Sequence, residues 1–312
     1  MSEPQVVGRF APSPSGRMHL GNIFTAVMSW ASVRSRSGRW VLRIEDLDPQ
    51  RSKLEYARQI EDDLRWLGLD WDEGGLADIG PHGPYSQSRR HEIYEQALTS
   101  LLSTGLVYPC TCTRAEIHTS SAPHASDGRV IYSGHCRPAH LPYNSSLITP
   151  QSSLRLAVGS RIEQFVDLIQ GPQSVDLARE FGDFVLRRAD GAWAYQLAVV
   201  VDDALMGITE VMRGEDLLLS TGPQLYLYHL LGYTPPRFAH LPLICNEAGQ
   251  RLSKRDGSLS MEALRATHTP AQLLGRIAHL ARLQPAPIPL TPIQLLTLYQ
   301  AKKKEYSSSE SR

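Results

Sequence analysis

The chain has 312 residues, in which 32 lysines and arginines balance 32 aspartates and glutamates. This length can bury more than one core, so we expect two or three subdomains. The zero net charge excludes a globally basic nucleic-acid-binding protein, and any such contact must use a local basic face. No apolar run reaches the roughly 18 residues of a membrane span and no secretory leader is recognisable, which predicts a cytoplasmic protein without membrane contact.

Strand-like and helix-like patterns alternate in the first third of the chain. In order, we expect a strand at 6–10, a helix from about 21, a buried strand within 40–48, a helix at 54–68 and a helix at 89–104. The helix at 54–68 places one apolar face inward, formed by Leu54, Ala57, Ile60, Leu64 and Leu67. This order predicts an α/β fold with a parallel, doubly wound sheet, which is a Rossmann-like architecture.

The middle of the chain is different. Residues 113–153 are rich in Ser, Pro, His and Gly and lack periodicity, so we interpret them as an irregular insertion. Regular patterns then return, with strands expected at 153–158, 162–169 and 183–188, a helix at 194–207, a strand at 208–214 and helices at 216–232, 269–283 and 290–300. The end, "KKKEYSSSESR", predicts a disordered tail.

The turn "APSPSGRMHLGN" places His19, Gly21 and Asn22 at the entrance of the first predicted helix. Free backbone N–H groups and the helix dipole favour an anion there. Gly21 lets a ligand approach the backbone, and His19 and Asn22 can donate hydrogen bonds to phosphate oxygens. Neither the dinucleotide fingerprint nor the Walker loop occurs. Taken alone, the pattern is more typical of an ordinary Pro/Gly turn with a surface histidine.

A second polar loop, "RLSKRDGS", carries Lys254 among small and basic residues. A loop lysine suits the stabilisation of charge that develops on phosphates during a displacement reaction. By itself this loop is more typical of a solvated basic surface. Its place more than two hundred residues after "MHLGN" is what makes the two patterns informative together.

The pair resembles the two signature motifs of class I aminoacyl-tRNA synthetases. The stretches "GRFAPSPSGRMHLGN", "LRIEDLD", "AYQLAVVVDD" and "VMRGEDLL" are similar to the glutamate-specific branch of that class, and they lie in order across residues 8–256. The chain stops soon after the lysine loop, so we expect no anticodon-binding domain. It therefore resembles the truncated paralogues of that branch, the glutamyl-queuosine tRNA(Asp) synthetases.

The resemblance implies roles for individual residues. It assigns the glutamate site to Arg9, Ala11, Ser13, Glu45, Tyr195 and Arg213, the ATP site to His19, Gly21, Asn22 and Lys254, and catalysis to His19, Asn22 and Lys254. Arg9 would pair with the side-chain carboxylate of glutamate, which suits the two-pronged guanidinium, and Glu45 would take the α-ammonium. The alternatives are a surface ion pair for Arg9 and Glu45 and an ordinary buried aromatic for Tyr195.

Three cysteines cluster in the sequence, as Cys110-x-Cys112 and Cys136. Thiolates are strong zinc ligands, and a structural zinc ion takes four ligands in a tetrahedron. General zinc chemistry suggests His118 or His135 as the fourth, although His135 is adjacent to Cys136. The family pattern makes Tyr132 the fourth ligand, in a structural zinc site that organises the insertion. Buried free thiols are the alternative, and Cys245 is expected to be one.

The resemblance implies a two-step reaction. Glutamate is activated with ATP and Mg²⁺ without tRNA, and is then transferred to the queuosine at the wobble position of tRNA(Asp). A monomer that docks the anticodon arm is expected. Candidate backbone contacts, with a solvated face as the alternative, are Arg34, Arg36, Arg39, Arg89 and Arg90. A compact synthetase that charges a tRNA 3′ end, or an idle tRNA-binding relative, would fit the same motifs.

These expectations divide the chain into five parts. Residues 1–108 and 191–245 would form the two halves of the catalytic domain, 109–190 a zinc-containing insertion facing tRNA, 246–301 the lysine loop and a helical stem-contact region, and 302–312 a disordered tail.

Overall fold

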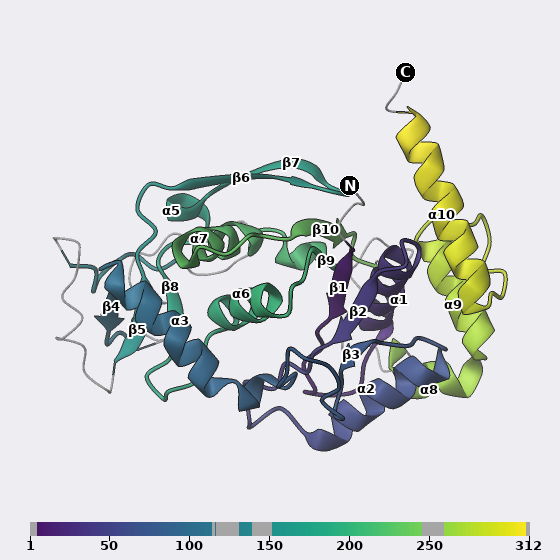
Figure 1. Cartoon of the computed structure of the whole chain (residues 1–312), viewed down its shortest axis with the longest axis horizontal. Helices are drawn as coiled ribbons and strands as arrows, with labels where there is room; N and C mark the ends of the chain where they lie inside the picture. Colours follow the sequence, from purple (N-terminus) through teal and green to yellow (C-terminus); the bar gives the residue numbers. More distant parts are fainter. Residues whose placement is uncertain (1–4, 114–115, 117–130, 139–151, 245–258, 310–312) are drawn as a thin grey trace. The chain divides into compact units, whose positions relative to one another are not determined.

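A computed structural model describes residues 5–113, 116, 131–138, 152–244 and 259–309 (Figure 1). The strands are β1 (Val7–Phe10), β2 (Arg39–Leu42), β3 (Glu73–Gly74), β4 (Val107–Cys110), β5 (Ser153–Leu156), β6 (Ile162–Asp167), β7 (Gly171–Asp176), β8 (Phe184–Arg187), β9 (Glu210–Gly214) and β10 (Arg237–Leu241). The helices are α1 (Leu20–Arg34), α2 (Leu54–Trp66), α3 (His91–Ser103), α5 (Leu177–Glu180), α6 (Tyr195–Leu205), α7 (Thr221–Leu231), α8 (Met261–Thr267), α9 (Pro270–Leu280) and α10 (Pro292–Ser309).

The chain divides into two compact units. The first comprises residues 1–89, 207–215 and 237–312, and the second comprises residues 90–206 and 216–236. Within the described parts of the chain, no helix combines the length and the apolar character that a membrane span requires.

The first unit is built on a five-stranded sheet with the order β10-β9-β1-β2-β3. All neighbouring strands run parallel. From β1 the sheet continues through β2 and β3 to one edge, and through β9 and β10 to the other edge. The strand order therefore reverses between β1 and β9. The predicted parallel α/β architecture is therefore confirmed. In such sheets, ligands bind outside the carboxyl ends of the strands at the point of reversal.

Helix α1 packs closely on one face of this sheet because β1 offers it a glycine. A Cβ atom on Gly8 would lie 2.4 Å from Cγ2 of Val33, too close for any side chain. On the same face the rings of Phe10 and Trp40 stack with centroids 6.2 Å apart, and Trp40 Nε1 donates to Ser29 Oγ of α1 at 2.8 Å. Helices α9 and α10 pack against α1 in turn (Figure 1). Side chains alternate along a strand, so the odd-numbered residues of β1 point to the opposite face.

Several features of the first unit differ from the expectation. Leu54, expected on the buried face of α2, is 56% exposed because it is the first residue of the helix. The short helix α8 and the strand β10 have no counterpart among the predicted elements. Helix α10 continues to Ser309, past its predicted end at Gln300 and into the segment expected to be a disordered tail.

The second unit combines an antiparallel sheet, in the order β4-β5-β8, with the β6–β7 hairpin. Helices α3, α6 and α7 pack against one another, and α7 also packs on the hairpin. Helix α7 begins at Thr221, later than expected, because residues 215–217 form a separate 3-10 helix. It ends where the sequence predicts, at Gly232, which adopts the left-handed conformation that favours glycine at this position.

Candidate functional site

Residues from four segments of the first unit gather at the carboxyl ends of β1, β2 and β9 and at the start of α1. We call them the sheet-edge site, which comprises Arg9, Ala11, His19, Gly21, Asn22, Glu45 and Arg213. They surround the point where the strand order of the sheet reverses.

Two buried arginines of this site lie on the same face of the sheet. Arg9 is on the face of β1 opposite α1, and it is 5% exposed. On the neighbouring strand β9, Glu210 faces α1, because Ser32 of that helix donates to its Oε1 at 2.7 Å. Arg213 lies three residues further on and therefore points to the same side as Arg9, with 4% exposure. Two guanidinium groups on adjacent strands favour a ligand that carries a carboxylate.

Arg213 is held by β10, a strand that the sequence did not reveal. It stands opposite His240 in the parallel register, and its Nε donates to Nε2 of His240 at 2.9 Å. The guanidinium carbon also lies 5.4 Å from the centroid of the Phe238 ring. Since Nε2 of His240 accepts this bond, the imidazole is neutral and adds no charge to the site. The pair orients Arg213 without consuming its positive charge.

The chain after β1 runs beside the chain after β2 and places Glu45 at the site. The N–H groups of Arg43 and Glu45 donate to the carbonyls of Phe10 and Pro12, both at 3.0 Å. These bonds continue the parallel pairing beyond the two strands and put Ser13 beside Glu45. The Glu45 carboxylate forms an ion pair of 3.0 Å with the fully buried Arg43. The negative charge of Glu45 would attract an ammonium group.

The three residues at the start of α1 form a cap that orients their side chains. His19 Nδ1 accepts from the N–H of Gly21, and the N–H of His19 donates to Asn22 Oδ1, both at 3.1 Å. This is a capping box in which histidine and asparagine replace the usual residues. Because Nδ1 is an acceptor, the neutral ring carries its proton on Nε2, and Asn22 keeps its NH₂ group as a donor. One N–H expected to face an anion, that of Gly21, is bonded to His19.

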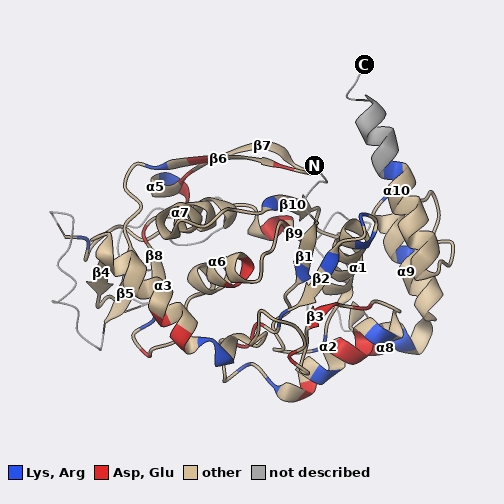
Figure 2. Cartoon of the chain, in the orientation of Figure 1, with Lys and Arg blue, Asp and Glu red and all other residues tan. Residues whose placement is uncertain are grey.

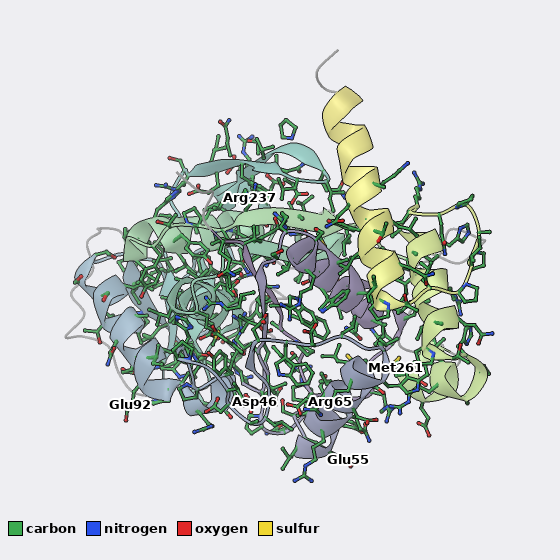
Figure 3. The ribbon with its side chains drawn as sticks, turned by 45° about the vertical axis from the view of Figure 1, so that its right-hand side comes forward. Asp46, Glu55, Arg65, Glu92, Arg237 and Met261 are labelled. Atoms are coloured by element: carbon green, nitrogen blue, oxygen red, sulfur yellow. The ribbon has the colours of Figure 1, made fainter. Side chains whose placement is uncertain are left out.

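The segment that follows the lysine loop is anchored beside His19. Lys254 itself lies outside the described residues. Among the described residues that follow this loop, Ser260 pairs with His19 in an antiparallel bridge, and the N–H of Met261 donates to the carbonyl of Met18 at 2.8 Å. Met261, labelled in Figure 3, is fully buried. The chain that carries the lysine therefore returns to the N-terminus of α1.

Asp63 on α2 links the turn before His19 to helix α8. Its Oδ1 lies 2.8 Å from Nη1 of Arg265 on α8 and 3.5 Å from Nη2 of Arg17. Figure 2 shows acidic residues on α2, which lies next to α8. Burial raises the pKa of Asp63, although both arginines oppose that shift. Sequence reasoning missed this residue, and the signal was its place three residues after Ile60 on the inward face of α2.

The remaining predicted contacts differ in their surroundings. Ser13 lies beside Glu45 but is exposed, and Tyr195 is the half-buried first residue of α6 in the second unit. The prediction that Arg90 contacts tRNA is wrong, because this residue is 1% exposed and its Nε donates to the buried carboxylate of Asp202 at 2.6 Å. The other four arginines form ion pairs, which are Arg34 with Asp70 and Asp72, Arg36 with Glu210, Arg39 with Glu73 and Arg89 with Asp78.

The second unit brings together Cys110, Cys112, Tyr132 and Cys136, which we call the cysteine cluster. The three sulfur atoms lie within 4.8 Å of one another, and the Sγ atoms of Cys112 and Cys136 are 3.4 Å apart. The Tyr132 oxygen lies 3.4 Å from Sγ of Cys110 and 3.8 Å from that of Cys112. Ligand sulfurs around a tetrahedral zinc ion are separated by about 3.8 Å, so this donor set fits such an ion. His135 is exposed, and His118 lies outside the described residues.

The thiols of the cluster differ in acidity. Burial and the hydrogen bond with Cys136 raise the pKa of Cys112 to about 11. Burial acts the same way on Cys136, but hydrogen bonds from Tyr132 and the backbone of Thr111 outweigh it and lower its pKa to about 6. The backbone N–H of Cys136 donates to the Tyr132 oxygen at 2.8 Å, which makes that oxygen an acceptor. A bound cation would favour the thiolate form of all three cysteines.

Comparison with known proteins decides the family. The family model described as class I tRNA synthetases (E and Q), catalytic domain, matches residues 5–286. The chain belongs to this family. Among its relatives are glutamyl-Q tRNA(Asp) synthetases of Symbiobacterium thermophilum and Nitratidesulfovibrio vulgaris, each 47% identical. The alignments cover 94% and 91% of this chain and 91% and 89% of those relatives. The predicted resemblance to this branch of the synthetase family is therefore confirmed.

Longer synthetases match over part of their length. A glutamate–tRNA ligase of Sulfurihydrogenibium is 45% identical over 262 residues, which are 82% of this chain and 54% of that ligase. The crystal structure of a glutamate tRNA ligase from Elizabethkingia meningosepticum in complex with its amino acid superposes with a TM-score of 0.79 at 30% identity. The match covers 94% of this chain and spans 64% of that ligase chain. The synthetase fold of the chain is thus shared with an amino-acid-binding enzyme.

Proposed function

We propose that the protein activates glutamate with ATP and transfers it to the queuosine of tRNA(Asp). The observation that carries the proposal is the pair of buried arginines, Arg9 and Arg213, on one face of the sheet where its strand order reverses. Relatives that match nearly end to end are named glutamyl-Q tRNA(Asp) synthetases, which supports this acceptor over a tRNA 3′ end.

Glutamate would bind across the sheet edge with its two charged ends held apart. Arg9 would take the side-chain carboxylate, with Ala11 and Ser13 lining the pocket, and Arg213 would add a further contact. Glu45, on the neighbouring chain segment, would take the α-ammonium. Tyr195 is proposed as a further contact on the ground of the family resemblance alone. The α-carboxylate is then left to react.

Activation needs no protein nucleophile. An oxygen of the α-carboxylate attacks the α-phosphorus of ATP, the bond to the β-phosphate breaks, and pyrophosphate leaves. ATP would bind with Mg²⁺, which neutralises charge on the phosphates. The Nε2–H of His19, the amide of Asn22 and the backbone near Gly21 would hold the phosphates from one side, and Lys254 from the other. Because His19 and Asn22 are fixed by the cap, their donors need little reorganisation.

Transfer completes the reaction. A hydroxyl of the cyclopentenediol ring of queuosine attacks the carbonyl carbon of glutamyl-adenylate. An ester forms as the acyl–phosphate bond breaks, and AMP leaves. No residue of this chain needs to form a covalent intermediate in either step.

We further propose that the cysteine cluster holds a structural zinc ion. Cys110, Cys112 and Cys136 would supply three thiolates and Tyr132 a fourth, oxygen ligand. The donor separations support a tetrahedral site, and three sulfurs favour zinc over Mg²⁺ or Ca²⁺. The ion would supply a fold constraint and take no part in the chemistry.

Labelled glutamate tests the acceptor. The protein is incubated with the label, ATP and Mg²⁺, and with tRNA from queuosine-replete cells in one sample and from queuosine-deficient cells in the other. We expect label only in tRNA(Asp) from replete cells. Equal label in tRNA(Glu) from both sources would make the protein a compact 3′-end synthetase.

A second assay separates a catalyst from a tRNA-binding relative without activity. ATP–pyrophosphate exchange is measured with glutamate alone, in the absence of tRNA. We expect exchange, because all the contacts proposed for glutamate and ATP come from this chain and none from RNA. Absence of exchange, together with tRNA binding, would favour the inactive relative.

A further inference from the structure

Asp183 stands directly before β8 and is 1% exposed, with donors on both carboxylate oxygens. Oδ1 accepts from the N–H of Val158 at 2.9 Å and from Nη2 of Arg137 at 2.6 Å. Oδ2 accepts from the hydroxyl of Tyr108 at 2.5 Å and from Nε of Arg137 at 2.6 Å. One buried carboxylate thus ties three separate segments of the second unit together.

Two of these segments carry ligands of the cysteine cluster. Tyr108 stands two residues before Cys110 on β4, and Arg137 directly follows Cys136. The bond to Arg137 is bidentate, so it fixes the plane of the guanidinium as well as its distance. Asp183 therefore sets where the chain lies on both sides of the cluster.

The backbone around Asp183 holds the third ligand segment. Gly182 pairs with Tyr132 in an isolated parallel bridge, and its φ of +73° is one that other residues rarely adopt. A Cβ atom there would lie 2.9 Å from Cγ2 of Ile131. The carbonyl of Asp183 accepts from Nη1 of Arg155 at 2.9 Å, and that guanidinium lies 3.8 Å above the Tyr132 ring. This stacking is a cation–π contact that orients the ring.

We propose that Asp183 is a positioning residue that preorganises the cysteine cluster for its metal ion. The inference rests on the metal centre proposed above. Without Asp183, the ion itself would have to order the segments around Cys110, Tyr132 and Cys136, and this ordering would weaken binding.

Asp183→Asn is the sharpest test because it keeps the size of the side chain. Each carboxylate oxygen accepts from a different N–H of Arg137. Whichever way the new amide is oriented, its NH₂ group therefore faces a donor of Arg137, and one of the two bonds is lost. Asp202→Asn is the matched control, since Asp202 in the same unit is also buried and also accepts from an arginine, Arg90, and a tyrosine, Tyr94.

The affinity for Zn²⁺ is measured by competition with a chromophoric chelator, and the ligand geometry by the absorption of the Co²⁺-substituted protein. We expect Asp183→Asn to weaken Zn²⁺ binding by roughly 10- to 100-fold and to alter the tetrahedral Co²⁺ spectrum. The control is expected to bind as the unmodified protein does.

Each outcome bears on a different claim. Equal affinity in Asp183→Asn and the unmodified protein overturns the positioning role, and so does an equal loss in the control. If the unmodified protein binds no zinc, the metal centre fails and the inference fails with it. Should Asp183→Asn not fold, Arg137→Gln replaces it, because that side chain is 37% exposed. Unchanged zinc affinity in this variant overturns the proposal as well.

Discussion

The sheet-edge site and the cysteine cluster are built by different means. In the first, backbone pairing between parallel strands and a helix cap fix the functional side chains. In the second, Cys110 is the one of the four ligands that lies in a strand, and the segment with Tyr132 and Cys136 is held by the bonds of Arg137 to the buried Asp183 and by a backbone bridge at Gly182. A site of the first kind should lose activity and keep its fold when a side chain changes. A site of the second kind should lose local order.

Lys254→Ala should give the largest effect on the activation of glutamate. We expect the rate of glutamate-dependent ATP–pyrophosphate exchange to fall by about 10²- to 10³-fold, as for loss of a donor to developing charge. The KM for glutamate should stay unchanged, since the lysine is assigned to the phosphates. Lys53→Ala, at an exposed lysine, is the control. An equal loss in rate and in glutamate affinity would contradict this role.

Arg9→Lys tests whether the site recognises a carboxylate by its geometry. Lysine keeps the charge but loses the planar fork, so we expect the KM for glutamate to rise about 10- to 100-fold. Arg237→Lys is the matched control, because Arg237 (labelled in Figure 3) begins β10 in the same sheet and is largely exposed. Steady-state exchange kinetics measure both variants. An unchanged KM would remove Arg9 from the glutamate site.

Glu210→Gln should weaken the scaffold of the sheet-edge site and spare its chemistry. Glu210 lies at the start of β9, accepts from Ser32 on α1 and pairs with Arg36, which follows the end of that helix. Loss of these bonds should lower the free energy of unfolding by about 2 kcal/mol near neutral pH. The KM for glutamate should not change, and urea unfolding followed by circular dichroism gives the stability. A change in KM with unchanged stability would contradict the scaffold role.

The same variant has a pH signature. Burial raises the pKa of Glu210, but its bonds to Arg36 and Ser32 outweigh burial and lower it below the usual 4.5. A lowered native pKa means that the unfolded chain binds more protons in acid, so this stabilisation is present above about pH 4.5 and is lost as the pH falls. The difference in stability between the two proteins should therefore shrink as the pH falls below about 4.5.

Metal removal should affect the cysteine cluster and leave the sheet-edge site unchanged. After the metal has been removed with a chelator, the chelator dialysed away and Mg²⁺ supplied again, we expect transfer of glutamate to tRNA to fall roughly tenfold while ATP–pyrophosphate exchange stays unchanged, because the cysteine cluster belongs to the second unit. Restored transfer on adding Zn²⁺ is the control for irreversible damage. Loss of exchange in parallel with transfer would show that the sheet-edge site depends on the cluster.

The elements that the sequence predicted correctly are those whose local apolar pattern is strong. The strand at 6–10 and the helix that begins near Gly21 are apolar and periodic, and the parallel sheet followed from their alternation. β10 was missed because its short apolar run is interrupted by His240, which is fully buried and whose partner Arg213 lies 27 residues away in the chain. A single sequence shows the polar residue and not the partner that permits its burial.

The same limit explains the errors in the candidate site. Arg90 was expected to contact tRNA, yet its carboxylate partner, Asp202, lies 112 residues further along the chain. Asp183 was not singled out, since its donors come from Tyr108, Arg137 and Val158, which no local pattern connects to it. The spacing of the cysteines was informative without the structure because a metal site imposes its own short-range pattern.

His19 allows structure and chemistry to be separated at a single residue, because it caps helix α1 and is also proposed to bind phosphate. His19→Ala removes the acceptor for the Gly21 N–H and should cost about 1 kcal/mol of stability, together with activity. Asparagine is a good N-cap residue, so His19→Asn should restore most of that stability while still lacking the Nε2–H donor. Urea unfolding and ATP–pyrophosphate exchange on both variants separate the two tasks. If His19→Asn regains stability and full activity, the ring acts only as a cap, and the phosphates must be held by Asn22, the backbone and Lys254 alone.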